Sequence, residues 1–245
     1  MSEGARAPAR APRVGVAVPA AGSGHRMGGA RKPFLELAGE PVLLRALRPF
    51  LADERVVSVA VALAPPDAAS PPGWLTALAP RVTITVGGAT RTQSVRAALA
   101  ALPAELDAIA VHDAARPLVT RDVVAACIDL ALDGYGAIAG CPAVDTMKRV
   151  GPEATVLDTP DRASLGHAQT PQVFPARVLR AAYANPAAEG TDDAALVESA
   201  GVGTAVRMVD AGLTNFKVTR PLDVPLAEAI LRARAEGVGG RAGGA

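Results

Sequence analysis

The chain has 245 residues, of which 50% are apolar and only 3% aromatic, and its formal net charge is +1. Charges of both signs are scattered along it, which disfavours broad nucleic-acid binding because that usually requires a strongly basic face. The first apolar run is of strand length, far below the ~20 residues that span a membrane, so we expect neither a secretory signal nor a membrane anchor. Cys127 and Cys141 form no metal-binding motif, which disfavours a zinc site and favours reduced, buried thiols in a cytoplasmic protein.

Short apolar runs alternate with amphipathic stretches through the first half of the chain. The periodicity predicts strands at residues 14–18, 56–63, 82–86, 108–111 and 137–144, and helices at 41–51, 92–102 and 120–134, the last with Thr120 as its N-cap. Strands that alternate with helices in this way indicate an α/β fold, in which a mostly parallel sheet is flanked by helices on both faces.

The pattern changes after residue 144. Residues 145–175 contain short β-prone pieces but no convincing helix, so we expect a projecting arm there in place of another strand–helix–strand unit. Helices at 175–185 and 191–200, a strand at 205–209 and a closing helix from residue 221 complete a single domain over residues 13–236. We expect residues 1–12 to be a disordered tail and residues 237–245 a flexible one.

The first candidate site follows the first predicted strand, where a glycine-rich loop precedes Lys32. Small residues allow a backbone to approach a ligand closely, and a concave row of N–H groups suits an anion. The loop is neither a Walker A sequence nor a complete dinucleotide fingerprint, so a flexible glycine turn is the alternative interpretation. The added cations Arg26 and Lys32 favour the binding of a polyphosphate.

A second candidate site is the segment VHDAARP, which follows the strand at 108–111. Asp113 at the mouth of the sheet could hold Mg²⁺, a hard cation that prefers oxygen ligands. With equal weight, Asp113 could instead cap a turn or pair with Arg116. The alternation of the strand places His112 on the face opposite Asp113, which predicts a packed structural histidine in preference to a general base.

Further polar segments also follow predicted strands, and ligands of such sheets bind beyond the carboxyl ends of the strands. Gly88 precedes a helix that carries Ser94. The free N–H groups at the N-terminus of this helix could face a nucleotide, and a plain start of the helix is the alternative. Lys217 stands before the closing helix, where a surface role is the alternative. The polar residues of the arm could also contact a ligand, and a solvated, charged surface is the alternative.

Together these segments resemble the 2-C-methyl-D-erythritol 4-phosphate cytidylyltransferase family of the non-mevalonate isoprenoid pathway. The matching stretches run in order from Ala20 to Pro221: AAGSGHRM, RKPFL, GGATRTQSV, VHDAARP, DTMKR, DRASLGHAQTPQ, TDDAALVESAG and NFKVTRP. The resemblance implies a Rossmann-like nucleotidyltransferase with a projecting β-arm that builds a homodimer. It implies transfer of a cytidylyl group from CTP to methylerythritol phosphate, with pyrophosphate released and Mg²⁺ or another divalent cation required. A cytidylyltransferase for another polyol phosphate, such as ribitol 5-phosphate, is the alternative.

The same resemblance implies a role for each matching position. The catalytic cations would be Arg26, Lys32 and Lys217. The cytidine nucleotide would be bound by Ala20, Ala21, Gly22, Gly88 and Ser94. Methylerythritol phosphate would be bound by Asp113, Arg116, Thr146, Arg162 and Thr170, part of this pocket coming from the partner subunit, and Asp113 would also serve the metal.

Overall fold

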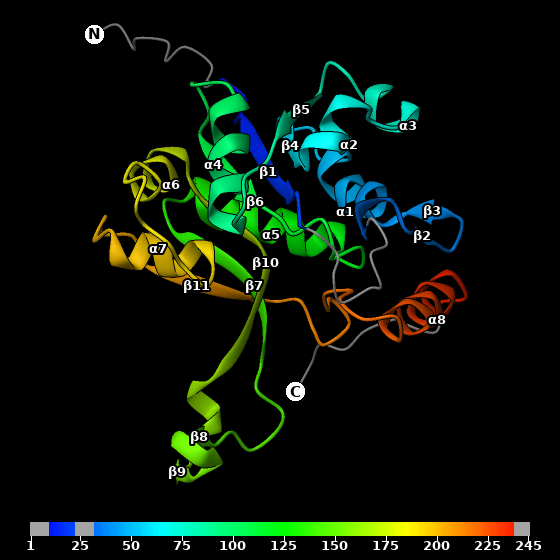
Figure 1. The fold of residues 1–245 in the computed structure, drawn as a ribbon. Helices are drawn as coiled ribbons and strands as arrows, with labels where there is room; N and C mark the ends of the chain where they lie inside the picture. The colour runs from blue at the N-terminus through cyan, green and yellow to red at the C-terminus, as the bar shows by residue number, and fades with distance from the viewer. Residues whose placement is uncertain (1–9, 23–31, 238–245) are drawn as a thin grey trace, which may run out of the picture.

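The computed structural model describes residues 10–22 and 32–237 of the chain. A seven-stranded sheet of order β11-β7-β10-β6-β1-β4-β5 forms its centre (Figure 1). Its strands are β1 (Val14–Ala20), β4 (Val56–Leu63), β5 (Val82–Val86), β6 (Ala108–Val111), β7 (Gly136–Pro142), β10 (Gly166–Pro175) and β11 (Val206–Asp210). Only β10 runs antiparallel to its sheet neighbours, β6 and β7. The predicted sheet, mostly parallel, is confirmed.

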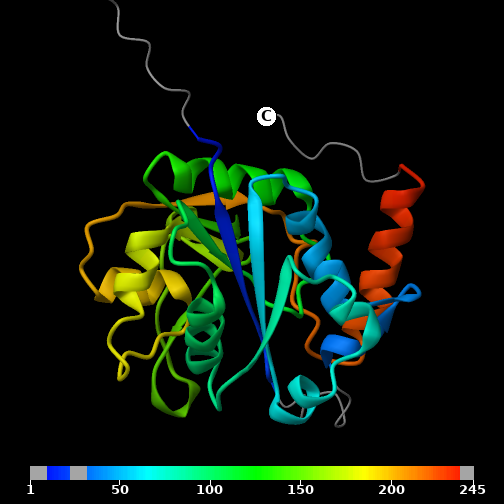
Figure 2. The same ribbon diagram turned by 90° about the horizontal axis from the view of Figure 1, so that it is seen from above.

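Helices cover both faces of the sheet, as the view from above shows (Figure 2). The helices of the described residues are α1 (Val42–Leu51), α2 (Pro65–Ala69), α3 (Gly73–Thr76), α4 (Arg91–Ala101), α5 (Arg121–Leu132), α6 (Ala176–Ala182), α7 (Asp193–Ser199) and α8 (Asp223–Ala235). Val16 and Val18 of β1 pack in the cluster that contains α1 and α5, whereas Ala17 packs with α4, α6 and α7 on the other face. Because β1 is buried on both faces, its sequence is a continuous apolar run.

Helix capping explains why the predicted boundaries are close to the observed ones. The Thr120 side chain accepts a hydrogen bond from the N–H of Val123 and caps α5, as predicted. Thr90 and Gln93 form a reciprocal capping box at the start of α4. The short helices α2 and α3 were not predicted, because four- and five-residue helices carry too little periodicity to be recognised.

The C-terminal helix α8 is attached to the body by a third, smaller apolar cluster. Ala227 of α8 packs there with Leu37, Val42, Leu118 and Val218. Leu37 belongs to a small hairpin formed by β2 (Glu36–Leu37) and β3 (Glu40–Pro41). The segment that carries Lys217 is therefore held between the sheet and α8.

The arm projects from the body at the far ends of β7 and β10 (Figure 1). It carries β8 (Arg149–Val150) and β9 (Val156–Asp158), which pair with each other, and the short helices η3 (Pro152–Ala154) and η4 (Arg162–Ser164). The predicted arm of 145–175 is too long at its C-terminal end. Val173 and Phe174 of β10 pair with β6 in the central sheet, and Val173 pairs with β7 as well.

The predicted N-terminal tail is partly corrected. Arg10 lies within the predicted tail of 1–12, yet its Nη2 is 2.8 Å from Oδ1 of Asp107. Residues 1–9 lie outside the described residues, as do residues 238–245 of the predicted C-terminal tail. In the described ranges, every helix is too short or too polar to cross a membrane.

Both cysteines are buried and unpaired, as predicted, Cys127 on α5 and Cys141 on β7. Burial raises the pKa of the Cys127 thiol to about 12. At neutral pH this thiol is therefore protonated and behaves as a small apolar side chain.

Candidate active site

The loops that follow β1, β5 and β6 lie at the carboxyl edge of the parallel strands. Ala20 ends β1, and Gly22 is the last described residue of the loop that follows it. A Cβ atom on Gly87, directly after β5, would lie 2.5 Å from Cβ of Ala21 and 2.9 Å from Oγ of Ser94. The loop after β1 and the loop after β5 therefore touch at Gly87, where only glycine fits. The prediction that the candidate residues share this edge is confirmed for the described residues of these loops, which are 20–22 and 87–88.

The loop before α4 is held by its own side chains. The N–H of Gly88 donates to Oγ of Ser94 at 3.2 Å, and Ser94 Oγ lies 3.0 Å from the Thr90 carbonyl oxygen. The Gln93 side chain accepts from the N–H of Ala89 at 2.9 Å. Ser94 is only 3% exposed, so in this structure it shapes the glycine turn. Its predicted contact with a nucleotide stays a prediction.

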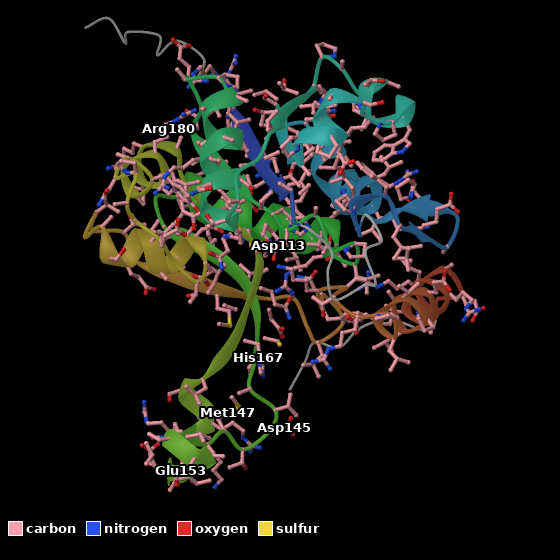
Figure 3. All side chains as sticks on the ribbon, in the orientation of Figure 1. Asp113, Asp145, Met147, Glu153, His167 and Arg180 are labelled. Carbon is pink, nitrogen blue, oxygen red and sulfur yellow. The ribbon has the colours of Figure 1, made fainter. Side chains whose placement is uncertain are left out.

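Asp113, labelled in Figure 3, lies two residues beyond β6 and is surrounded by cations. Its Oδ2 is 2.9 Å from Nζ of Lys217 and 3.6 Å from Nε of Arg116. Its Oδ1 accepts a hydrogen bond from Nε of Arg91 at 3.1 Å. We call these four residues the Asp113 cluster. Burial alone would raise the pKa of Asp113, but the charges of Lys217 and Arg91 hold it well below its usual range, so the carboxylate is ionised.

Lys217 is the member of the cluster most open to solvent. Its side chain is 42% exposed, against 9% for Asp113. Arg91, Arg116 and Lys217 face Asp113, and Arg91 also pairs with the buried Asp193, so three cations are set against two carboxylates and one positive charge remains in surplus at this edge. Such a surface is suited to an anionic ligand such as a phosphate.

Hydrogen bonds from distant segments position the cluster. The N–H of Val218, next to Lys217, donates to the carbonyl oxygen of Ala115 at 2.8 Å. Arg116 Nη1 donates to the carbonyl oxygen of Asn215 at 2.8 Å. The Asn215 side chain in turn donates to Oε1 of Gln169 at 2.8 Å and to the Thr170 carbonyl at 3.1 Å. The loop after β6, strand β10 and the segment before α8 are thus tied together.

Thr170 and His112 fix the backbone at Asp113. The Thr170 hydroxyl accepts a hydrogen bond from the N–H of Asp113 at 3.0 Å, which leaves its own proton for Nδ1 of His112 at 3.1 Å. The Nε2–H of His112 then donates to the carbonyl oxygen of Arg116 at 3.2 Å. Burial lowers the pKa of His112 to about 4, so the ring is neutral. The prediction of a packed structural histidine is confirmed, and Thr170 acts here as a support for Asp113.

Sequence reasoning missed a second carboxylate behind the cluster. Asp193 at the start of α7 is fully buried and accepts hydrogen bonds from both terminal nitrogens of Arg91. Gln169 and Asn215, which hold the cluster, were also not singled out. The available signal was their place inside the matching stretches TDDAALVESAG, DRASLGHAQTPQ and NFKVTRP.

Comparison with known proteins places this site in a family. Residues 14–233 match the family model described as 2-C-methyl-D-erythritol 4-phosphate cytidylyltransferase. The chain belongs to this family. A cytidylyltransferase of that name from Symbiobacterium thermophilum is 45% identical over 227 residues, which cover 91% of this chain and 94% of that protein. One from Streptomyces coelicolor is 45% identical over 242 residues, which cover 94% of this chain and 87% of that protein.

Solved structures agree with this assignment. The crystal structure of 2-C-methyl-D-erythritol 4-phosphate cytidylyltransferase from Thermus thermophilus superimposes with a TM-score of 0.72 and 34% identity, covering 91% of this chain and all of that chain (100%). The 4-diphosphocytidyl-2C-methyl-D-erythritol synthase from Anaerococcus prevotii has a TM-score of 0.81 at 24% identity and supports the fold alone.

Two residues expected in the cytidylyltransferase site lie apart from the Asp113 cluster in this chain. Thr146 and Arg162 belong to the arm, and Nη1 of Arg162 donates to the carbonyl oxygen of Val144 at 2.9 Å. The labelled neighbours Asp145 and Met147 show how far the arm extends from Asp113 (Figure 3). One chain by itself therefore does not bring the arm residues to the cluster.

The predicted catalytic residues of the first loop cannot be placed. Arg26 lies outside the described residues. Lys32 begins the short helix η2 (Lys32–Phe34), but its side chain also lies outside them. The roles expected for these two cations stay predictions.

The residues around Asp113 do not fit a resident metal ion. Both oxygens of Asp113 already face cations. The surplus positive charge of these cations would repel free Mg²⁺. In the part of the chain that the structure describes, no three Asp, Glu, His or Cys side chains lie close enough to share a metal. The role of Asp113 as a metal ligand stays a prediction, and the charges around this carboxylate do not favour it. Of the two earlier interpretations, the pairing with Arg116 is the observed one.

Proposed function

We propose that this chain transfers the cytidylyl group of CTP to 2-C-methyl-D-erythritol 4-phosphate and releases pyrophosphate. The observation that carries this proposal is the Asp113 cluster, a surplus of cations at the carboxyl edge of a cytidylyltransferase fold. A nucleotidyltransferase must bring two anions together, and only a positively charged site can do so at low cost. A ribitol 5-phosphate enzyme is not favoured, because the relatives are named for methylerythritol phosphate.

In the proposed reaction, an oxygen of the polyol phosphate attacks the α-phosphorus of CTP. A bond forms between them, the bond from the α-phosphorus to the oxygen that bridges to the β-phosphate breaks, and pyrophosphate leaves with the electron pair. A phosphate monoester is largely ionised at neutral pH, so no general base is needed. This agrees with a site in which His112, the histidine nearest Asp113 in sequence, is buried and neutral.

The residues of the site divide into two walls in this proposal. The backbone of residues 20–22 and 87–88, with Ser94 behind it, forms the nucleotide wall, where close approach is possible because the side chains are small. Lys217 and Arg116 form the phosphate wall, where they would offset the negative charge that develops on the equatorial oxygens and on the leaving group. Arg26 and Lys32 would act on the triphosphate from the first loop.

Mg²⁺ belongs to this proposal as part of the nucleotide substrate. The triphosphate of CTP supplies the oxygen ligands that Mg²⁺ prefers, and Mg²⁺ usually keeps several waters and few protein ligands. The cationic cluster would then bind the magnesium–CTP complex through the remaining phosphate charge. No role of Asp113 as a metal ligand is needed.

A homodimer is the second part of the proposal. The arm exposes Val150, Val156 and Leu157, each more than half accessible at 54%, 57% and 59%. Apolar side chains on a projecting arm favour a partner surface that covers them. A second copy of the chain would also bring its Thr146 and Arg162 to the methylerythritol phosphate pocket. The cytoplasmic location expected from the unpaired cysteines is proposed with it.

A rate comparison tests the proposed substrate. Pyrophosphate release would be measured with magnesium–CTP and either methylerythritol phosphate or ribitol 5-phosphate. We expect kcat/KM to be higher with methylerythritol phosphate by about tenfold or more, since a missing or misplaced contact in a polar pocket commonly costs this much. Activity with ribitol 5-phosphate alone would contradict the proposal and support the alternative.

A further inference from the structure

Asp193 is a carboxylate with no exposure to solvent, and it lies one contact behind the Asp113 cluster. Its Oδ1 accepts from Nη1 of Arg91 at 3.0 Å and its Oδ2 accepts from Nη2 of Arg91 at 2.7 Å. The Tyr183 hydroxyl also donates to Oδ1, at 2.5 Å. An ionised carboxylate needs such partners to stay buried, so Asp193 and Arg91 form a fixed, bidentate pair.

Arg91 bridges two buried carboxylates with one planar group. Each of its two terminal nitrogens donates one N–H to Asp193, and Nε donates to Oδ1 of Asp113. Burial alone would lower the pKa of Arg91, but the charges of Asp193 and Asp113 raise it, so the bridge remains charged. Because the guanidinium is rigid, the position of Asp193 sets the direction from which Arg91 reaches Asp113.

Asp193 is itself held in place by strand β10. The neighbouring Asp192 caps α7 through the N–H of Ala195 at 2.9 Å. Gln172 of β10 donates to Asp192 at 2.9 Å and accepts from the N–H of Ala194 at 2.8 Å. Strand β10 also carries Thr170, which supports Asp113. The positions of Asp113 and Asp193 are therefore both fixed by contacts with the same strand.

The distribution of hydrogen bonds over Asp113 depends on this arrangement. With its terminal nitrogens directed at Asp193, Arg91 contacts Oδ1 of Asp113, whereas Oδ2 faces Lys217 at 2.9 Å and, at 3.6 Å, Arg116. Without the charge of Asp193, the guanidinium would gain most by forming its own bidentate pair with Asp113. It would then compete with Lys217 for Oδ2 and shift the lysine that faces the substrate.

We propose that Asp193 is a positioning residue: it occupies the fork of Arg91 so that Asp113 keeps one oxygen for Lys217. The inference rests on the proposed function, because it concerns the site for methylerythritol phosphate. Asp193 does not touch the substrate itself. It acts through Arg91 on the orientation of Asp113 and Lys217.

The variant Asp193→Asn tests this, since it keeps the shape of the side chain and removes its charge. We expect the KM for methylerythritol phosphate at saturating CTP to rise, and kcat/KM with it to fall by about tenfold or more, as misplacement of a substrate-binding group commonly does. The KM for CTP should change by less than about twofold, because the glycine turn at Gly88 is held by Ser94 and Gln93 without Asp193. A purely structural role would lower the active fraction and leave both KM values unchanged.

Asp122→Asn is the control, because it removes an exposed carboxylate from the first turn of another helix, α5, and leaves Asp192, Gln172 and the Arg91 pair unchanged. It should keep the kinetic constants near those of the wild type. If Asp193→Asn does not fold, Arg91→Lys asks the same question, since an ammonium cannot hold both carboxylates as a fork, and we expect the same fall in kcat/KM. Wild-type constants in Asp193→Asn, or in Arg91→Lys, would overturn the inference alone. A wild-type chain that is inactive with CTP and methylerythritol phosphate would overturn the proposed function as well.

Discussion

Asp113 is a single buried carboxylate that fixes three cations, and the most exposed of the three is Lys217. The Asp113–Lys217 contact is half open to solvent, so its value for stability is small. Its value for the reaction is larger, because a positioned cation acts where charge develops in the transition state. At the scale of single residues, Lys217 therefore contributes to the reaction far more than to the stability of the fold.

Replacement of Lys217 by alanine should reduce turnover by about 100-fold or more, in line with the loss of one charge-stabilising donor from other active sites. Pyrophosphate release at saturating substrates measures this, and thermal unfolding should change little. Arg232→Ala, which removes an exposed cation from the last turn of α8, is the control and should keep wild-type turnover. Turnover of Lys217→Ala close to wild type would remove Lys217 from the mechanism.

His112 should make folding stability depend on pH between about 6.5 and about 4. Its pKa is lowered by burial from 6.5 to about 4, so the unfolded chain takes up a proton first as the pH falls. Stability is therefore complete above pH 6.5 and declines by about 3 kcal/mol as the pH falls to 4. Chemical denaturation across this range would show the decline in the wild type and not in His112→Gln. His167→Gln, which changes an exposed histidine, is the matched control.

Three of the four residues of the Asp113 cluster could be predicted one by one, but neither Arg91 nor the arrangement of the four could. Asp113, Arg116 and Lys217 stand after strands or before a helix, where the carboxyl-edge rule expects ligand contacts. Asp193 gave no such signal, because its partner Arg91 is 102 positions away in sequence. A buried pair of this kind depends on tertiary packing, which local patterns do not encode.

At the scale of elements, short runs of apolar and β-branched residues were the most predictable. β4, β5 and β6 were predicted with their observed bounds, although β5 is an edge strand in which only Val82 is buried. β10 was not, since Gln169, Thr170 and Gln172 are polar although they are 7%, 3% and 1% exposed. These polar side chains led us to predict an arm from the sequence. In the structure they lie inside the sheet, where residues of other segments satisfy their hydrogen bonds.

The N-cap of α5 gives a test at this scale. Thr120→Ala removes the acceptor for the N–H of Val123 and should lower the free energy of unfolding by about 1 kcal/mol. Thr120→Ser keeps the hydroxyl and should retain most of the stability. Denaturant unfolding of the three proteins measures the difference, and equal stabilities would contradict the assigned cap.

At the scale of the whole molecule, the arm decides whether one chain is enough. Thr146 and Arg162 belong to an arm that leaves the body, whereas the Asp113 cluster lies at the carboxyl edge of the sheet (Figures 1 and 3). The residue pattern after residue 144 and the resemblance to the family both predicted the arm, and its exposed apolar residues agree with a covered surface. A complete site would then require the arm of a second copy.

Leu157→Asp tests the proposed dimer. A charge on the exposed apolar face of β9 should convert a dimer to a monomer, as measured by light scattering after size-exclusion chromatography, because its burial would be costly. Turnover should fall with it by about tenfold or more, since a misplaced substrate contact commonly costs this much. Leu226→Asp, an equally exposed change on α8, should remain dimeric and active. A monomeric wild type with full activity would contradict the composite site.

The central claim is that the reaction joins the α-phosphorus of CTP to a polyol phosphate. CTP labelled with phosphorus-32 at either the α or the γ position, incubated with methylerythritol phosphate and the protein, tests it most directly. We predict that the α label appears in the polyol product and the γ label appears only in pyrophosphate. Transfer of the γ label to the polyol, or no labelled product, would contradict the claim.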